Sequence, residues 1–141
     1  MVADTKHGGV LNMKAYVAFK FKEDYSDKEF IEKVSSALHT AGLDTVVMVR
    51  DYEKWGAVKM TPQEFMPLAL KAIDDCDILI AEFSEKGVGL GIETGYAYAK
   101  EKPVIVIAKS GTQISDTLSG IAKQIIFYKN PEELEGINFI I

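Results

Sequence analysis

One acidic residue, Glu93, follows a run of alternating glycines in the segment SEKGVGLGIETGYAYAKEKPV, residues 84–104. Gly87, Gly89 and Gly91 leave the backbone bare, so that a ligand can come close to its N–H groups. The start of the helix that follows favours an anion. A carboxylate in a first helical turn can simply balance the helix dipole, an interaction that stabilises the helix by about 0.3–1 kcal/mol. The glycine spacing favours the other interpretation, a site where the Glu93 carboxylate faces a bound ligand.

The glycine run fits neither of the common phosphate-binding patterns. Its G-x-G-x-G spacing lacks the third glycine of the dinucleotide fingerprint, and no Gly-Lys-Ser/Thr of a P-loop follows it. The sequence also has few side chains that commonly bind metals, because Cys76 is the only cysteine and His7 and His39 are the only histidines. These counts exclude an internal disulfide and a Cys-rich zinc site. We therefore expect no metal and no cofactor.

Charge and length limit the partners of this 141-residue chain. The formal net charge of -5 argues against a nucleic-acid polymer or an anionic membrane surface, but leaves room for a small anionic ligand. No apolar run approaches the roughly 20 residues that span a bilayer. The start, MVADTKHGGVLN, lacks the apolar core of a signal peptide. We expect a disordered lead over residues 1–12, a single domain over 13–141 and a cytoplasmic location.

Hydrophobic patterning predicts elements that alternate between strand and helix. Strands are expected over residues 14–21, 44–51, 77–83, 103–109 and 125–128, and helices over 26–42, 61–75, 91–101 and 112–123. Ser26 with Glu29, and Thr61 with Glu64, have the spacing of capping boxes at two helix starts. Pro67 lies inside the second helix and should bend it or delay its start.

This alternation predicts one three-layer α/β domain with a flavodoxin-like parallel sheet of about five strands, in the order 2-1-3-4-5. In such sheets, ligands bind beyond the carboxyl ends of the strands. Three segments should meet there: the end of the first strand, the loop over residues 51–59, and the glycine run before Glu93.

One segment resembles the core of the nucleoside 2-deoxyribosyltransferases. It is DCDILIAEFSEKGVGLGIETGYAYAKEKPVIVIAKSG, residues 75–111, where the matching residues are most closely spaced. Within that superfamily it is similar to the 2'-deoxynucleoside 5'-phosphate N-hydrolases. The residues that match in order and spacing are Asp77, Ala81, Gly89, Glu93, Gly95, Ala97, Lys102 and Pro103. The resemblance extends more thinly over residues 14–120.

This resemblance implies cleavage or transfer at the N-glycosidic bond of a nucleoside or nucleoside 5'-monophosphate. Glu93 matches the position of the nucleophile, which faces the positive charge that develops at the anomeric carbon. Tyr16 matches a tyrosine that orients this glutamate, although an aromatic residue is also ordinary in a strand. Ser115 matches a serine that reaches the substrate phosphate across a dimer interface, although it equally suits a helix cap. A homodimer is therefore expected, with Phe65, Met66 and Leu68 as apolar contacts.

Two departures concern the phosphate of such a substrate. The family carries small residues after its first strand, whereas this chain has the bulkier and basic Lys20 and Lys22. Either lysine is a candidate to hold a phosphate. The hydrolases contact phosphate through a loop serine where this chain has Gly87, so only backbone contacts are expected there.

The largest departure concerns the proton for the leaving base. The family has an aspartate eight residues before Asp77, and this chain has Ala69 there. The neighbouring positions on that helix face, Phe65, Met66, Ala72 and Ile73, are all apolar. Loss of a general acid typically lowers the rate by about 10²–10⁴. Three possibilities stay open: a slow enzyme, an enzyme that uses Asp51 or Glu53 instead, or a protein that only binds nucleotides.

Two classes of function follow, with the enzyme as the leading hypothesis. The alternative is a non-catalytic nucleotide-binding module that has kept the pocket and lost the acid. A cytokinin-type phosphoribohydrolase ranks last, because its double-glycine and Gly-Thr signature is absent from the sequence. The partner in every case is a small-molecule nucleoside or nucleotide.

Overall fold

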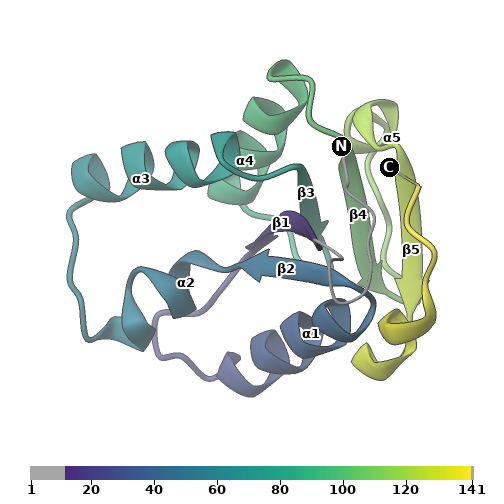
Figure 1. Ribbon diagram of the computed structural model, residues 1–141, viewed down its shortest axis with the longest axis horizontal. Helices are drawn as coiled ribbons and strands as arrows, with labels where there is room; N and C mark the ends of the chain where they lie inside the picture. Colours follow the sequence, from purple (N-terminus) through teal and green to yellow (C-terminus); the bar gives the residue numbers. More distant parts are fainter. Residues whose placement is uncertain (1–11, 141) are drawn as a thin grey trace.

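Five parallel strands form the centre of the molecule, in the order β2-β1-β3-β4-β5 (Figure 1). They are β1 (Met13–Phe19), β2 (Leu43–Val46), β3 (Ile78–Glu82), β4 (Val104–Lys109) and β5 (Gln124–Tyr128). This computed structural model describes residues 12–140, so the predicted lead over residues 1–12 lies almost wholly outside the described residues. The predicted flavodoxin-like fold and strand order are confirmed.

Helices cover both faces of this sheet. The 13-residue α1 (Lys28–Thr40) and the 3-10 helix η2 (Pro131–Gly136) pack on one face. The other face carries α3 (Pro62–Asp74), α4 (Val88–Ala99) and α5 (Asp116–Ile121). Because successive side chains of a strand point to opposite faces, Val17 joins the first core while Tyr16 and Ala18 join the second. Tyr16 is thereby directed to the face that α4 covers.

The second predicted strand, over residues 44–51, is wrong in its second half. β2 ends at Val46, and Met48–Asp51 form a helical turn, α2, followed by the 3-10 helix η1 (Lys54–Gly56). The carboxylate of Asp51 accepts the Val47 N–H at 2.9 Å, which closes this turn. Arg50 reaches back from α2 to the Thr45 carbonyl at 2.8 Å. These contacts outweigh the strand propensity of the valines.

Of the two predicted capping boxes, one forms and one does not. Thr61 Oγ1 accepts the Glu64 N–H at 3.2 Å while Glu64 Oε1 accepts the Thr61 N–H at 2.9 Å, so that α3 begins at Pro62. It then runs on through Pro67, and the expected late start is wrong.

The predicted box of Ser26 with Glu29 is absent, because α1 begins at Lys28 with Asp27 at its N-cap position. The Asp27 side chain does not cap the helix and instead accepts the Lys22 N–H at 3.0 Å.

The helix that carries Glu93 begins earlier than predicted. α4 starts at Val88 with Gly87 as its N-cap, so Gly89 and Gly91 lie inside the helix rather than in a loop. Glu93 therefore lies in the second turn, and its expected place in the first turn is wrong. Balancing the dipole at the helix start is then no explanation for this carboxylate.

Candidate active site

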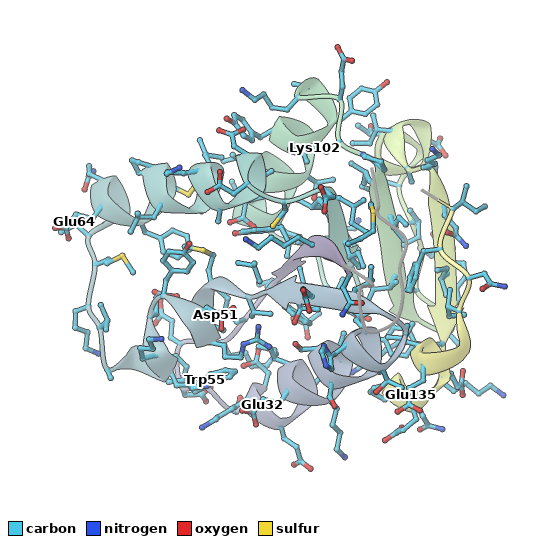
Figure 2. All side chains as sticks on the ribbon, in the orientation of Figure 1. Glu32, Asp51, Trp55, Glu64, Lys102 and Glu135 are labelled. Carbon is cyan, nitrogen blue, oxygen red and sulfur yellow. The ribbon has the colours of Figure 1, made fainter. Side chains whose placement is uncertain are left out.

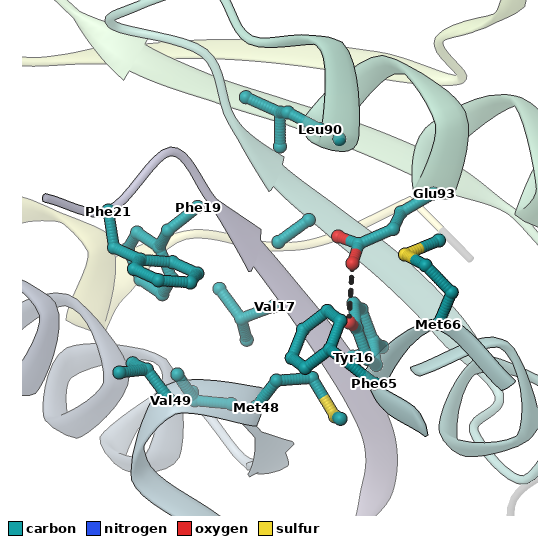
Figure 3. Close-up of a pocket in the computed structure, with 13 residues that line it drawn as sticks. Tyr16, Val17, Phe19, Phe21, Met48, Val49, Phe65, Met66, Leu90 and Glu93 are labelled. Atoms are coloured by element: carbon teal, nitrogen blue, oxygen red, sulfur yellow. Dashed lines mark hydrogen bonds between the residues drawn. The ribbon is translucent and has the colours of Figure 1, made fainter. Parts of the chain in front are cut away.

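Tyr16 and Glu93 meet in the layer between the sheet and α4, although they lie 77 positions apart in the sequence. The Tyr16 hydroxyl donates a hydrogen bond to Glu93 Oε2 at 3.0 Å, drawn as the dashed line in Figure 3. Both side chains are buried, with 1% of Tyr16 and 8% of Glu93 exposed. The sequence-predicted pair of site residues is thus in direct contact.

A cavity of about 180 Å³ lies beside this pair. Its other walls are apolar and come from the end of β1, the β2–α2 segment, α3 and the first turn of α4 (Figure 3). The apolar side chains that line it are Val17, Ala18, Phe19, Phe21, Val47, Met48, Val49, Phe65, Met66 and Leu90. An apolar chamber with one carboxylate suits a flat ring attached to a centre that becomes positive.

Burial changes the protonation of both groups in this pair. It raises the pKa of Glu93 from 4.5 to about 7, and the hydrogen bond from Tyr16 opposes this effect only in part. Burial, followed by the neighbouring charge of Glu93, raises the pKa of Tyr16 far above its ordinary value of 10.0. Tyr16 therefore keeps its proton and acts as a donor, while Glu93 is poised between its two forms near neutral pH.

The three glycines of the sequence motif have different surroundings. Gly89 borders the cavity of Glu93, and Gly91 is exposed two residues further along α4. A β-carbon added at Gly89 or Gly91 would touch nothing within 4 Å, so open space surrounds the start of α4 at both positions. At Gly87 a β-carbon would lie 3.2 Å from the Lys20 side chain. A side chain at position 87 would therefore be tight against Lys20 unless that exposed side chain shifted.

The remaining predicted binding residues border two other cavities, each similar in volume to the first. Gly87 and Ser115 border one of about 190 Å³, together with Lys86. Lys20 and Lys22 border another of about 190 Å³. Lys22 Nζ lies 3.3 Å from the carboxylate of Glu85.

Ser115 is the N-cap of α5, and its hydroxyl oxygen accepts the Leu118 N–H at 3.2 Å. The helix-cap interpretation of this serine therefore matches the contact that is present.

At the position of the missing aspartate, Ala69 is fully buried in the core between α3 and the sheet. The acids nearby in sequence are engaged elsewhere. Glu64 is held in its capping box, Asp74 accepts the Tyr96 hydroxyl at 2.9 Å and Asp75 pairs with Lys71 at 3.4 Å. Among the described residues that line the cavity, Tyr16 and Glu93 are the only titratable ones.

Sequence reasoning missed one wall of the cavity. Met48 and Val49 were expected in a strand, whereas α2 turns them toward the end of β1, and they border the cavity with Phe21 (Figure 3). Phe65 and Met66, expected at a dimer interface, border the same cavity. The sequence signal that was available is Arg50 followed by Asp51, a charged pair that is unusual at the end of a buried parallel strand.

Two further properties concern the whole described part of the chain. Within residues 12–140, no three His, Cys, Asp or Glu side chains cluster closely enough to hold a metal ion. In the same part, no helix is long and apolar enough to cross a membrane.

Known proteins share this sequence pattern and this fold. The profile of the nucleoside 2-deoxyribosyltransferase family matches residues 16–133, which include both members of the Tyr16–Glu93 pair. The chain belongs to this family. A relative from Thermofilum pendens, provisionally named 2'-deoxynucleoside 5'-phosphate N-hydrolase 1, is 32% identical over 101 residues, or 68% of each chain.

Two solved structures have the same fold as this family member. The 2-deoxyribosyltransferase of Bacillus psychrosaccharolyticus aligns with a TM-score of 0.68 and 18% identity, over 89% of this chain and 93% of the other. The CMP N-glycosidase of Clostridium botulinum aligns with a TM-score of 0.62 and 22% identity, over 86% and 94%. The names of these proteins describe cleavage or transfer at the N-glycosidic bond of nucleosides or nucleotides.

Proposed function

We propose that this protein cleaves the N-glycosidic bond of a nucleoside or nucleoside 5'-monophosphate, with Glu93 as its nucleophile. The observation that carries the proposal is the contact of a buried carboxylate with a single hydroxyl donor beside an apolar cavity. Tyr16 occupies Oε2 and leaves Oε1 facing the cavity (Figure 3). One oxygen is thus positioned while the other is able to react.

In the first step, Oε1 attacks the anomeric carbon of the sugar and the bond from that carbon to the base nitrogen breaks. The electron pair of this bond leaves with the base, which takes up a proton. The product on the protein is a glycosyl ester of Glu93. Positive charge builds at the anomeric carbon as this bond breaks, and the negative charge of an ionised Glu93 stabilises it.

In the second step, the oxygen of water attacks the same carbon and loses a proton, the ester bond breaks and Glu93 regains its carboxylate. A second nucleobase in place of water gives transfer rather than hydrolysis. Tyr16 holds the carboxylate in one orientation through both steps, because its raised pKa keeps the hydroxyl protonated.

A 5'-phosphate is best accommodated beside Gly87, which borders a cavity with Lys86. Lys20 packs across Gly87 and adds positive charge at this edge, whereas Lys22 is paired with Glu85. In this proposal the protein is a homodimer, and Ser115 contacts the phosphate held by the partner subunit. Leu68 on α3 is 38% exposed and contributes to the dimer contact.

A non-catalytic nucleotide-binding module is the second candidate. It is favoured by the absence of a proton donor other than Tyr16 and Glu93 among the described cavity-lining residues. Such a protein binds nucleotides in the apolar cavity and releases no base.

The test combines base release and binding on one panel of ribo- and deoxyribonucleosides and their 5'-monophosphates. Chromatography measures free base, with and without a second base as acceptor, and calorimetry measures binding. We expect base release by the wild type, and a fall of several orders of magnitude in Glu93→Gln. Glu32→Gln, an exposed charge-matched change on α1 (Figure 2), should leave turnover unchanged.

Each other outcome has a distinct meaning. Equal rates in the wild type and Glu93→Gln would show that the nucleophile assignment is wrong. Binding without base release by the wild type would favour the module.

A further inference from the structure

Among the residues that the structure describes, none that lines the cavity is free to protonate a departing base. Of its described lining residues only Tyr16 and Glu93 are titratable, and Glu93 is needed in its ionised form. Tyr16 already donates to Glu93, and its raised pKa makes it a poor acid. A nucleobase that leaves as an anion is a poor leaving group, so an acid from behind the apolar wall is required.

Two carboxylates follow β2 behind that wall, and the first of them, Asp51, is occupied. Its Oδ1 accepts Arg50 Nε at 2.7 Å, and its Oδ2 accepts the Val47 N–H and Arg50 Nη2, each at 2.9 Å. Burial alone would raise the pKa of Asp51, but these hydrogen bonds and the Arg50 charge outweigh it and lower the pKa. Asp51 is thus an ionised anchor for α2 and holds no proton to give.

The second carboxylate, Glu53, has the opposite surroundings. Its Oε1 is buried and has no hydrogen-bond partner among the described residues. Burial raises the pKa of Glu53, and no hydrogen bond or neighbouring charge offsets this. Burial without a hydrogen-bond donor shifts a carboxyl group toward its protonated form.

Glu53 lies behind one wall of the cavity and does not itself line it. Its backbone N–H donates to the Met48 carbonyl at 3.0 Å, and Met48 is part of the cavity wall. The Tyr16 hydroxyl is close enough to sense the charge of Glu53, which adds to burial and to the Glu93 charge in raising the Tyr16 pKa. Glu53 therefore lies on the Met48 side of the cavity, and Glu93 lies on the α4 side.

We propose that Glu53 is the general acid that protonates the leaving base, an assignment that rests on the proposed function above. As the bond from the anomeric carbon to the base breaks, its electron pair moves onto the base and the proton moves from Glu53 to a ring nitrogen or exocyclic oxygen. In the second step, the attacking water gives its proton to the Glu53 carboxylate. Both carboxyl groups then return to their starting forms.

The experiment compares two substrates on the same protein. The first is the best monophosphate from the panel. The second is its counterpart with an activated base, N7-methylated for a purine or 5-fluorinated for a pyrimidine, which departs with less need of a proton. In Glu53→Gln we expect kcat to fall by about 10²–10⁴ on the first substrate and by under about 10-fold on the second. Glu32→Gln should leave both rates unchanged.

The ratio of the two rates separates an acid from a merely structural residue. Partial unfolding of Glu53→Gln lowers both rates by the same factor, so it cancels in the ratio. If the wild type releases base and Glu53→Gln slows both substrates equally, or neither, the role of Glu53 is overturned while the proposed function stands. If the wild type releases base from neither substrate, the proposed function fails and the acid assignment fails with it.

Discussion

Replacing Glu93 by glutamine should make the protein more stable at alkaline pH even though it removes the nucleophile. The reason is that Glu93 is buried, with 8% of the residue exposed, and its carboxylate receives a hydrogen bond from Tyr16. Its charge has lost most of its hydration and has gained one donor in return. The folded state therefore favours the protonated form, and glutamine mimics that form closely.

The size of the effect follows from the two pKa values of Glu93, about 4.5 in the unfolded chain and about 7 in the folded protein. Below pH 4.5 the group is protonated in both states and contributes no difference. Between these values the unfolded chain gives up its proton while the folded protein keeps it, so the free energy of unfolding falls as pH rises. Above pH 7 the loss is complete, at about 3 kcal/mol. Glu93→Gln avoids this loss.

The assay is thermal unfolding of the wild type and Glu93→Gln between pH 4 and pH 8.5. The two melting temperatures should nearly coincide at pH 4 and separate by roughly 10 °C at pH 8. Glu32→Gln, with its exposed carboxylate, should follow the wild type at every pH. A gap between the Glu93→Gln and wild-type proteins that stays constant with pH would refute the claim that burial holds the Glu93 pKa near 7.

Three further predictions concern the site and its supports. Tyr16→Phe removes the hydrogen bond that partly lowers the Glu93 pKa, so the rising limb of a pH–rate profile should move above pH 7, whereas an unmoved limb would contradict this contact. Thr61→Ala removes the cap of α3 and should cost about 1 kcal/mol in a denaturant titration with kcat unchanged. Light scattering at tens of micromolar should give a homodimer, and a monodisperse monomer would contradict both the dimer and the role of Ser115 across it.

The sheet was predictable because most of its strands are recognisable from the apolar residues within each segment alone. The segments at 77–83 and 103–109 are almost continuously apolar, as expected of parallel strands covered on both faces. The segment at 44–51 was not predictable from its valines. One of the contacts that hold the turn after β2 runs from Arg50 to Ser35 on α1, and a residue pair 15 positions apart leaves no periodic pattern.

The candidate site was predictable to a similar extent. The resemblance to the family pointed to Glu93 and Tyr16, and their hydrogen bond agrees with it. The start of α4 at Val88 could not be predicted from the sequence, because Gly89 and Gly91 are poor helix formers. Leu90, 3% exposed in the core beneath α4, supplies the tertiary contact that overrides this propensity. The wall built by α2 was hidden with the end of β2. Asp51 and Glu53 were both open as replacement acids in the sequence, and only their different contacts in the structure distinguish them.

A second buried tyrosine–glutamate pair shows what makes the first one suitable for chemistry. The Tyr128 hydroxyl donates to Glu82 Oε2, and Glu82 is 4% exposed. Ser84 also donates to Glu82, through its N–H to Oε1 at 3.0 Å and through its hydroxyl to Oε2. Both oxygens of Glu82 are thus occupied, and the group fixes the segment that leads from β3 to Gly87.

Glu93 differs from Glu82 in the number of its donors rather than in its burial. One oxygen of Glu93 is held by Tyr16, and the other faces an apolar cavity. Each further donor would stabilise the carboxylate, lower its pKa and weaken it as a nucleophile. The same two residue types therefore serve as an anchor where three donors converge and as a reactive group where only one does. Because the Ser84 donors come from the loop and the cavity comes from α2, α3 and α4, tertiary structure decides which of the two glutamates can react.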